Sequence, residues 1–288
     1  FTYRLENMIF NKFFILFKIG RKIGKSNIIN IVSETHKIPV FIKLFFNLLA
    51  FSFSSSNNTK SKGKENLSES IQEMGTTFIK LGQFLATRPD IIGEKLSKEL
   101  ESLQDKLPPF SKKEAEKIII ENLGQSNFDD IIDLSEPIAA ASIAQVHKAK
   151  IKEDNIIKNV AIKVLRPNIK KIFNDEIDAI MLLAYIVESL VAKTKRLKLI
   201  EVVFLFKEIT NHEMDLRFEA AAANEYAENT KNDLGFFVPK IYWNFTGESV
   251  LTLDWVDGVS IREKDLLKEK NIETSKIATN LIQHFLRH

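Results

Sequence analysis

From residue 67 onwards, apolar residues recur every three or four positions, which predicts a series of amphipathic helices. The first predicted helix covers Leu67–Thr87 and ends at an Arg-Pro pair, because proline disfavours helical backbone in the residue before it. A second helix is predicted over 91–103. A third begins after Ser111, where Glu114 completes a capping box. The region 67–124 is therefore predicted to be helical.

The pattern changes after residue 124, where short β-branched runs appear among long helical stretches. Val160–Leu165 predicts a buried strand, and Val238–Trp243 and Ser249–Val256 predict two more. Helical periodicity covers the remaining long stretches, which are Ile169–Ala192, Leu199–Thr230 and Ser275–His288. Because helices and strands do not alternate regularly, the predicted fold class is α+β rather than a doubly wound sheet.

The first 51 residues are both apolar and basic. Their apolar stretches, Phe10–Ile19 and Ile38–Phe53, carry lysines and are shorter than the roughly 20 residues of a membrane-spanning helix. Two interpretations of residues 1–51 stay open: a pair of amphipathic helices docked on the core, or helices lying on an anionic membrane surface. The serine- and asparagine-rich residues 52–66 predict a linker.

Composition excludes several classes of protein without selecting a function. The chain has 288 residues with 41 Lys+Arg and 38 Asp+Glu, and its net charge of +3 is too small to indicate nucleic-acid binding. The absence of cysteine excludes a disulfide framework, thiol redox chemistry and any cysteine-based zinc site. No nucleic-acid partner is expected.

Lys163 is the sharpest chemical signal, because it stands inside the predicted strand Val160–Leu165, where an unpaired buried charge would be costly. In protein kinases a lysine in such a Val-Ala-Ile-Lys strand contacts the nucleotide phosphates and pairs with a helix glutamate. The alternative is a lysine on an edge strand that points into water.

A kinase carries a glycine-rich loop before that strand, and this chain has an alanine run in the same place. The run is Ala139-Ala140-Ala141-Ser142. Alanine is small enough for the backbone to approach a phosphate, although it is stiffer than glycine. The alternative is an ordinary alanine-rich helical turn.

Four separated motifs, in this order, resemble those of the UbiB/ADCK family of atypical protein-kinase-like proteins. The first motif is Phe78-Ile-Lys80-Leu-Gly82-Gln83 with Leu107-Pro108-Pro109-Phe110 downstream, which is similar to the family's KxGQ signature. The second and third are the alanine run Ala139–Ser142 and the strand lysine Lys163. The fourth is Glu213-Met-Asp215-Leu-Arg-Phe-Glu219, which is similar to the family's ExD helix. The resemblance runs from about Leu67 to the end of the chain.

The resemblance implies a site for ATP and Mg²⁺. It pairs Lys163 with Glu213, and it pairs Lys80, which would fold over the pocket, with Glu219. Gln83 belongs to the same signature as Lys80. Without the resemblance, Glu213 and Glu219 would be interpreted as a solvated face of one helix.

The resemblance also implies a hinge strand, in which the backbone of Asp254 to Val256 hydrogen-bonds the adenine. The nucleotide-binding residues expected from the sequence are thus Lys80, Gln83, Ala139, Ala140, Ala141, Ser142, Lys163, Glu213, Glu219, Asp254 and Val256.

Phosphate transfer needs further groups that cannot be assigned in this chain. A kinase uses a catalytic-loop Asp and Asn and a metal-binding Asp of a DFG motif, and the family order places these after the 275–288 helix. The triplet Asp233-Leu-Gly235 precedes the hinge strand and is not interpreted as DFG. His284 and His288 share a helix face but lack a third ligand, so they are interpreted as solvated and no metal ligand is named.

The sequence therefore predicts the N-terminal portion of a UbiB-like atypical kinase or ATPase, a phosphotransferase that supports ubiquinone biosynthesis. Residues 125–288 would form a kinase-like N-lobe after a helical extension, 67–124, without the C-lobe, and this chain alone is expected to be inactive. Ubiquinone-biosynthesis proteins or lipid are the expected partners, and the expected location is the cytoplasmic side of a bacterial inner membrane, or the cytoplasm. The alternatives are a non-catalytic lipid- or protein-binding module and a truncated, inactive gene product.

Overall fold

The computed structural model describes residues 14–24, 67–103, 107–190, 192–233 and 235–287. Contacts divide the chain into two compact units, each built from three stretches of sequence. Unit 1 contains Phe1–Pro108, Ala141–Ile143 and Pro167–His212, and unit 2 contains Pro109–Ala140, Ala144–Arg166 and Glu213–His288. The α+β class predicted from the sequence is confirmed, with a small antiparallel sheet and many helices.

Unit 1 is helical. Its elements are a helix over 14–24, α4 (Leu67–Met74), α5 (Thr76–Ala86), α6 (Pro89–Ile92), α7 (Glu94–Leu100), α10 (Ile169–Leu190), η1 (Ala192–Leu197) and α11, which ends at the unit boundary (Leu199–Glu213). The single helices predicted over Leu67–Thr87 and 91–103 are wrong, because glycines interrupt both. Gly75 and Gly93 have φ values of 105° and 84°, in the left-handed region where a helix cannot continue.

The helix over 14–24 is docked on the core of unit 1. Its Ile19 is buried with Met74, Phe78 and Ala179. The membrane-surface interpretation of residues 1–51 stays a prediction. The second predicted apolar stretch, Ile38–Phe53, and the predicted linker lie outside the described residues. Of the helices that the structure describes, none combines the length and the apolar character needed to cross a bilayer.

Helices α10 and α11 pack against each other within unit 1. Lys207 Nζ lies 3.1 Å from Asp178 Oδ1, and the rings of Phe173 and Phe206 meet at a centroid distance of 5.5 Å. These side chains join the two helices into a helical hairpin.

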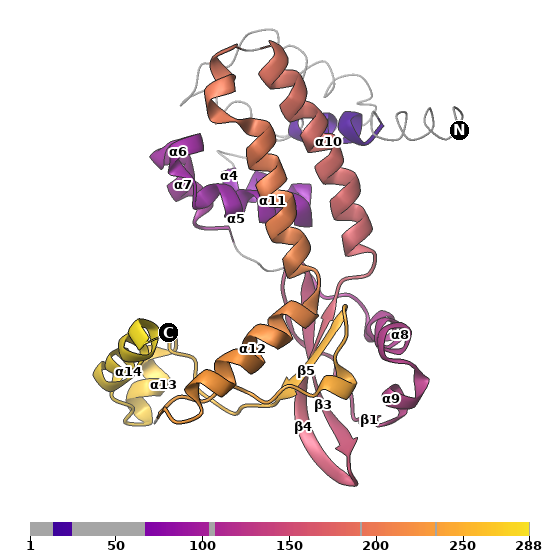
Figure 1. Ribbon diagram of the computed structural model, residues 1–288, viewed down its shortest axis with the longest axis vertical. Coiled ribbons are helices and arrows are strands. Elements are labelled where there is room, and N and C mark those ends of the chain that lie inside the picture. Colours follow the sequence, from indigo (N-terminus) through magenta and orange to yellow (C-terminus); the bar gives the residue numbers. More distant parts are fainter. Residues whose placement is uncertain (1–13, 25–66, 104–106, 191, 234, 288) are drawn as a thin grey trace. The chain divides into compact units, whose positions relative to one another are not determined.

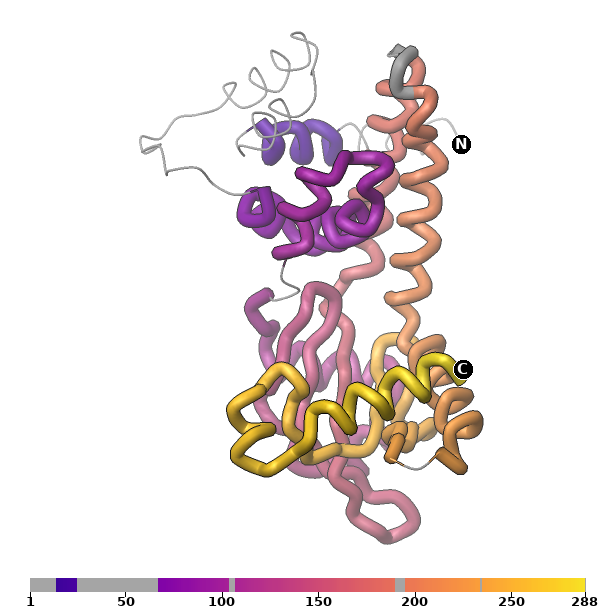
Figure 2. Tube along the Cα trace, turned by 90° about the vertical axis from the view of Figure 1, so that its left-hand side faces the viewer, coloured from indigo at the N-terminus to yellow at the C-terminus, as the bar shows by residue number. Residues whose placement is uncertain are grey.

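Unit 2 contains the antiparallel sheet (Figure 1). Its strands are β1 (Ile131–Ile132), β2 (Pro137–Ala140), β3 (Ala144–Glu153), β4 (Ile156–Leu165) and β5 (Val250–Asp254). The order is β1-β3-β4-β5, and β2 also pairs with β3. Strands β3 and β4 pair along their whole length, whereas β4 pairs with β5 only along Val160–Val164, so the β3–β4 hairpin extends beyond β5 (Figures 1 and 2).

The two strands predicted on either side of Gly247 have different outcomes. Ser249–Val256 contains β5, as predicted. The strand predicted over Val238–Trp243 is wrong, because this segment makes only an isolated bridge between Ile241 and Leu253, followed by the short helix η2 (Trp243–Phe245).

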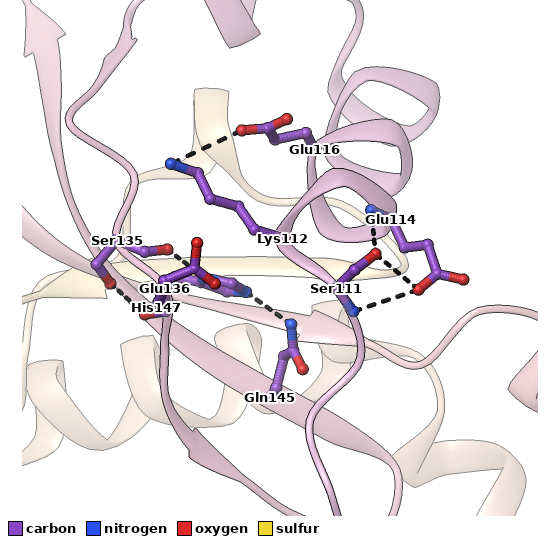
Figure 3. A network of polar contacts seen from close by, with 8 residues as sticks. All are labelled: Ser111, Lys112, Glu114, Glu116, Ser135, Glu136, Gln145 and His147. Carbon is purple, nitrogen blue, oxygen red and sulfur yellow. Dashed lines mark hydrogen bonds and ion pairs between the residues drawn. The ribbon is translucent and has the colours of Figure 1, made fainter.

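One face of the sheet is covered by α8 (Lys112–Leu123), which is followed by the short α9 (Gln125–Asp129). Ala115 and Ile119 of α8 are fully buried against Val160, Ile162 and Val164 of β4. The predicted capping box is confirmed, because Ser111 accepts a hydrogen bond from the Glu114 backbone and the Glu114 carboxylate accepts one from the Ser111 backbone (Figure 3). The start of α8 is thus fixed by its own sequence.

Helix α12 (Leu216–Thr230) contacts β5 of the sheet. The single helix predicted over Leu199–Thr230 is wrong, because the helix is interrupted at Asp215. The Asp215 side chain caps the N-terminus of α12.

Glu248 and Ser249 bind the residues on both sides of the stretch Pro167–His212, where the chain leaves unit 2. Leu165 N donates to Ser249 O at 3.0 Å, and Leu216 N donates to Glu248 O at 2.9 Å. The chain therefore leaves and re-enters unit 2 at one place.

Unit 2 ends in α13 (Lys264–Glu269) and α14 (Thr274–Arg287). The interpretation of His284 as a solvated residue is wrong: it is 7% exposed, and its Nδ1 lies 3.1 Å from Asp233 Oδ2. Its ring also contacts that of Phe236, with centroids 4.6 Å apart. His284 therefore holds α14 against the segment that follows α12.

Candidate functional site

The register of the sheet places Lys163 on the face opposite α8. Directly opposed residues of antiparallel strands point to the same side. Val146, Lys163 and Leu251 form one row across β3, β4 and β5. Lys148, Ala161 and Leu253 form the next row on the same face. This face, which we call the open face, thus carries small and apolar side chains together with two lysines.

Glu219 of α12 binds Lys163 from this side. Lys163 Nζ lies 2.9 Å from Oε1 and 2.6 Å from Oε2 of Glu219. The side chains are 27% and 50% exposed. The predicted pairing of Lys163 with Glu213 is therefore wrong, although a helix glutamate is its partner as expected.

The break at Asp215 explains which glutamate is used. Glu213 is the last residue of α11, whereas Glu219 lies in the first turn of α12. The sequence predicts that the two carboxylates share one helix face, and this prediction is wrong. The N-terminal end of a helix carries partial positive charge, which favours Glu219 at that position.

The alanine run forms a strand and a turn, so the alternative of a helical turn is wrong. Ala139 and Ala140 end β2 and pair with Val146 and Gln145 of β3. Ala141 to Ile143 connect the two strands, which places the run, here called the alanine loop (Ala139–Ser142), where a kinase has its glycine-rich loop.

Within unit 1, Ser142 contacts the helix that carries the KxGQ signature. The Thr76 hydroxyl, at the start of α5, donates to Ser142 O at 3.3 Å. Ser142 itself is fully buried. Lys80 and Gln83 lie further along α5 in unit 1 and are half-buried; their part in the site, including the pairing of Lys80 with Glu219, stays a prediction.

The predicted hinge begins where β5 ends. Asp254 N donates to Lys240 O at 3.0 Å, and the Asp254 carboxylate accepts a hydrogen bond of 2.6 Å from the Tyr242 hydroxyl. Burial and the bond to Asp254 raise the pKa of Tyr242, so its hydroxyl stays a donor. Val256 is exposed just beyond the strand.

Sequence reasoning missed two residues of the apolar lining of the open face. Val146 and Ala161 stand beside Lys163 in the sheet, and the alternation along β3 and β4 would have identified them. Trp255 follows the hinge strand, and Lys148 Nζ lies 4.3 Å from the centre of its ring. Within the described ranges, no group of three or more acidic or histidine side chains is placed to hold a metal ion.

Comparison with known proteins shows what the chain is similar to. It matches the ABC1 atypical kinase-like domain over residues 102–288. It is 32% identical over 250 residues to the protein named "Probable protein kinase UbiB" of Marinobacter nauticus, which covers 86% of this chain and 45% of the relative. A protein of the same name from Pseudomonas paraeruginosa is 29% identical over 272 residues, 94% of this chain and 50% of that protein. The chain spans about half the length of the curated relatives it matches.

Proposed function

Because the chain belongs to the family of ABC1 (UbiB) atypical kinase-like domains, we propose that the open face of its sheet binds ATP. The single observation that carries the proposal is the Lys163–Glu219 pair on this face. A nucleotide there would lay its adenine against the apolar side chains of Val146, Ala161 and Leu253, and its phosphates would reach Lys163.

The energetics of the ion pair support a role in binding rather than in folding. A partly exposed salt bridge contributes about 1 kcal/mol or less to stability, and Lys163 stands in β4 between two other strands, where an apolar residue would pack well. A charge-assisted hydrogen bond to a phosphate is worth roughly 1.5–3 kcal/mol. Glu219 would hold the ammonium group in place for such a bond.

The chemistry of the whole protein is part of the same proposal. We propose that it uses ATP and Mg²⁺ as an atypical kinase or ATPase, and that it supports ubiquinone biosynthesis at a membrane. The relatives named as protein kinases support the first part. The described residues supply the lysine, its glutamate and the apolar lining of the nucleotide site, and no ligand for Mg²⁺ is assigned among them.

Replacement of Lys163 tests the proposal. Lys163→Met should weaken binding of a fluorescent ATP analogue, measured with magnesium chloride in an equilibrium titration, by roughly tenfold or more. Lys158→Met is the matched control, because Lys158 lies on the same strand in the exposed part of the β3–β4 hairpin. Equal affinity in both variants, or no binding by the wild-type chain, contradicts the proposed site.

A further inference from the structure

Gln145 makes a paired contact with the backbone of Phe110. Phe110 N donates to Gln145 Oε1 at 2.9 Å, and Gln145 Nε2 donates to Phe110 O at 3.2 Å. The side chain is 1% exposed. Both ends of one buried amide are thus used to hold a loop that lies 35 positions earlier in the chain.

His147 fixes the orientation of that amide (Figure 3). His147 Nδ1 lies 2.8 Å from Ser135 O, and its Nε2 lies 2.9 Å from Gln145 Nε2. Because a carbonyl oxygen only accepts, Nδ1 carries the ring proton and Nε2 accepts from Gln145. The same orientation of Gln145 satisfies Phe110, so the four residues form one consistent chain of donors and acceptors.

The residues joined by these hydrogen bonds lie on both sides of the alanine loop in the sequence. Ser135 lies just before β2, and Gln145 lies three residues after Ser142 in β3. Phe110 closes the Leu107-Pro108-Pro109-Phe110 motif, and the Arg166 guanidinium lies 5.9 Å from its ring. The network therefore connects both flanks of the alanine loop to a motif that the proposed function leaves unexplained.

Stability alone does not explain a glutamine at this position. The residues opposite Gln145 in the sheet register are Val164 and, one strand further, Val250, both fully buried. An apolar side chain would pack in such surroundings without the desolvation that a buried amide requires. What an apolar side chain cannot do is set the position of Phe110 relative to β3.

We propose that Gln145 is a positioning residue for nucleotide binding, which holds the alanine loop in the conformation that accepts the phosphates. The proposal rests on the proposed ATP site. Alanine disfavours the positive φ values that let a glycine loop adapt to its ligand, so a loop of alanines gains most from being held in place beforehand.

Two measurements on the full chain test the proposal. Gln145→Met keeps the approximate volume and removes all the amide's bonds. It should raise the hydrogen-exchange rates of residues 137–144 without nucleotide, and it should weaken binding of the fluorescent ATP analogue with Mg²⁺ by about tenfold. Gln283→Met, at an exposed position of α14, is the matched control and should change neither quantity.

A conservative variant separates positioning from loss of fold. Gln145→Glu keeps the acceptor for Phe110 N and removes the donors to Phe110 O and to His147 Nε2, so exchange and binding should change in the same direction as in Gln145→Met. Should the methionine variant fail to fold, the glutamate variant decides the question.

The outcomes distinguish this inference from the proposed function. Lys163→Met should weaken binding and leave exchange at 137–144 unchanged, whereas Gln145→Met should alter both. Wild-type affinity together with wild-type exchange in the folded Gln145 variants overturns the inference. A wild-type chain that binds no nucleotide defeats the proposed function, and the exchange rates then still show whether Gln145 holds the loop.

Discussion

At the scale of single residues, the buried His147 holds the Gln145 amide in one orientation, and this requires its neutral form. Burial is the largest cause that lowers its pKa from the ordinary 6.5, and nearby Lys112 acts in the same direction. The Ser135 carbonyl, Glu136 and Glu116 act in the opposite direction, and burial outweighs them. The neutral ring is the form that the hydrogen bonds require, because a protonated Nε2 would face the donor group of Gln145.

The lowered pKa predicts a dependence of stability on pH. The unfolded chain binds a proton at His147 more readily than the folded one, so the free energy of unfolding should fall as pH drops below 6.5 towards the lowered folded pKa. Urea unfolding at pH 7.5 and pH 5.5 measures the effect.

His147→Phe is the comparison for this prediction, because it removes the titrating group and leaves the other histidines. The difference in unfolding free energy between wild type and variant should shrink at pH 5.5. A difference that is the same at both pH values would show that His147 does not contribute.

At the scale of elements, Asp215 sets the start of the helix that delivers Glu219. Its carboxylate accepts a hydrogen bond from Arg217 N at 3.1 Å, which caps α12, and it also binds the Arg217 side chain. The Asp215 side chain is 15% exposed and that of Arg217 is 59% exposed. The cap is therefore the more valuable of the two contacts, because an exposed ion pair adds little.

Two substitutions of Asp215 separate these contacts. Asp215→Ala should lower the free energy of unfolding by about 1 kcal/mol, and it should weaken nucleotide binding because the first turn that holds Glu219 frays. Asp215→Asn retains a capping oxygen and should cost only a few tenths of a kcal/mol. Urea titration compares the two variants, and equal losses in both would assign the stabilisation to the ion pair with Arg217.

Some elements could be predicted from local sequence because their ends carry their own signals. Ser111 and Glu114 fix the start of α8, and the β-branched run Val160–Leu165 forms most of β4, as predicted. The resemblance to the UbiB family, drawn from motifs spread over the chain, is confirmed by the comparisons.

Other features depend on contacts that one segment does not contain. Strand β2 is alanine-rich and has little strand preference of its own, so its conformation comes from pairing with β3. The partner of Lys163 depends on where α11 ends and α12 begins, and the continuous apolar pattern across Asp215 concealed that break. The contact of Gln145 with Phe110 joins residues 35 positions apart, so neither local segment contains it.

At the scale of the whole molecule, the two units interleave along the sequence. In the sequence, unit 2 resumes after the stretch Pro167–His212, and unit 2 residues on either side of this stretch, Leu165 and Leu216, bind Ser249 and Glu248. Because both flanks meet at one place, a short connection could replace the helical hairpin without moving either Leu165 or Leu216.

We therefore predict that unit 2 folds without unit 1. Residues 109–288, with a short glycine-serine linker in place of Pro167–His212, should unfold in one cooperative urea transition. Near-ultraviolet circular dichroism, which reports on Trp243 and Trp255, should show a folded signal before that transition. A gradual loss of signal would mean that the hairpin is needed for the fold of unit 2.

The common anchor at Glu248 and Ser249 also has an entropic consequence. When the hairpin Pro167–His212 is folded, its two helices run out and back and hold their ends together. When the hairpin is unfolded, folding of unit 2 must close a flexible loop of roughly 45 residues, and the lost chain entropy costs about 3 kcal/mol. A ligand that binds only the hairpin and stabilises its fold would thereby raise the melting temperature of the sheet. The two would be coupled through chain entropy, without a contact between ligand and sheet.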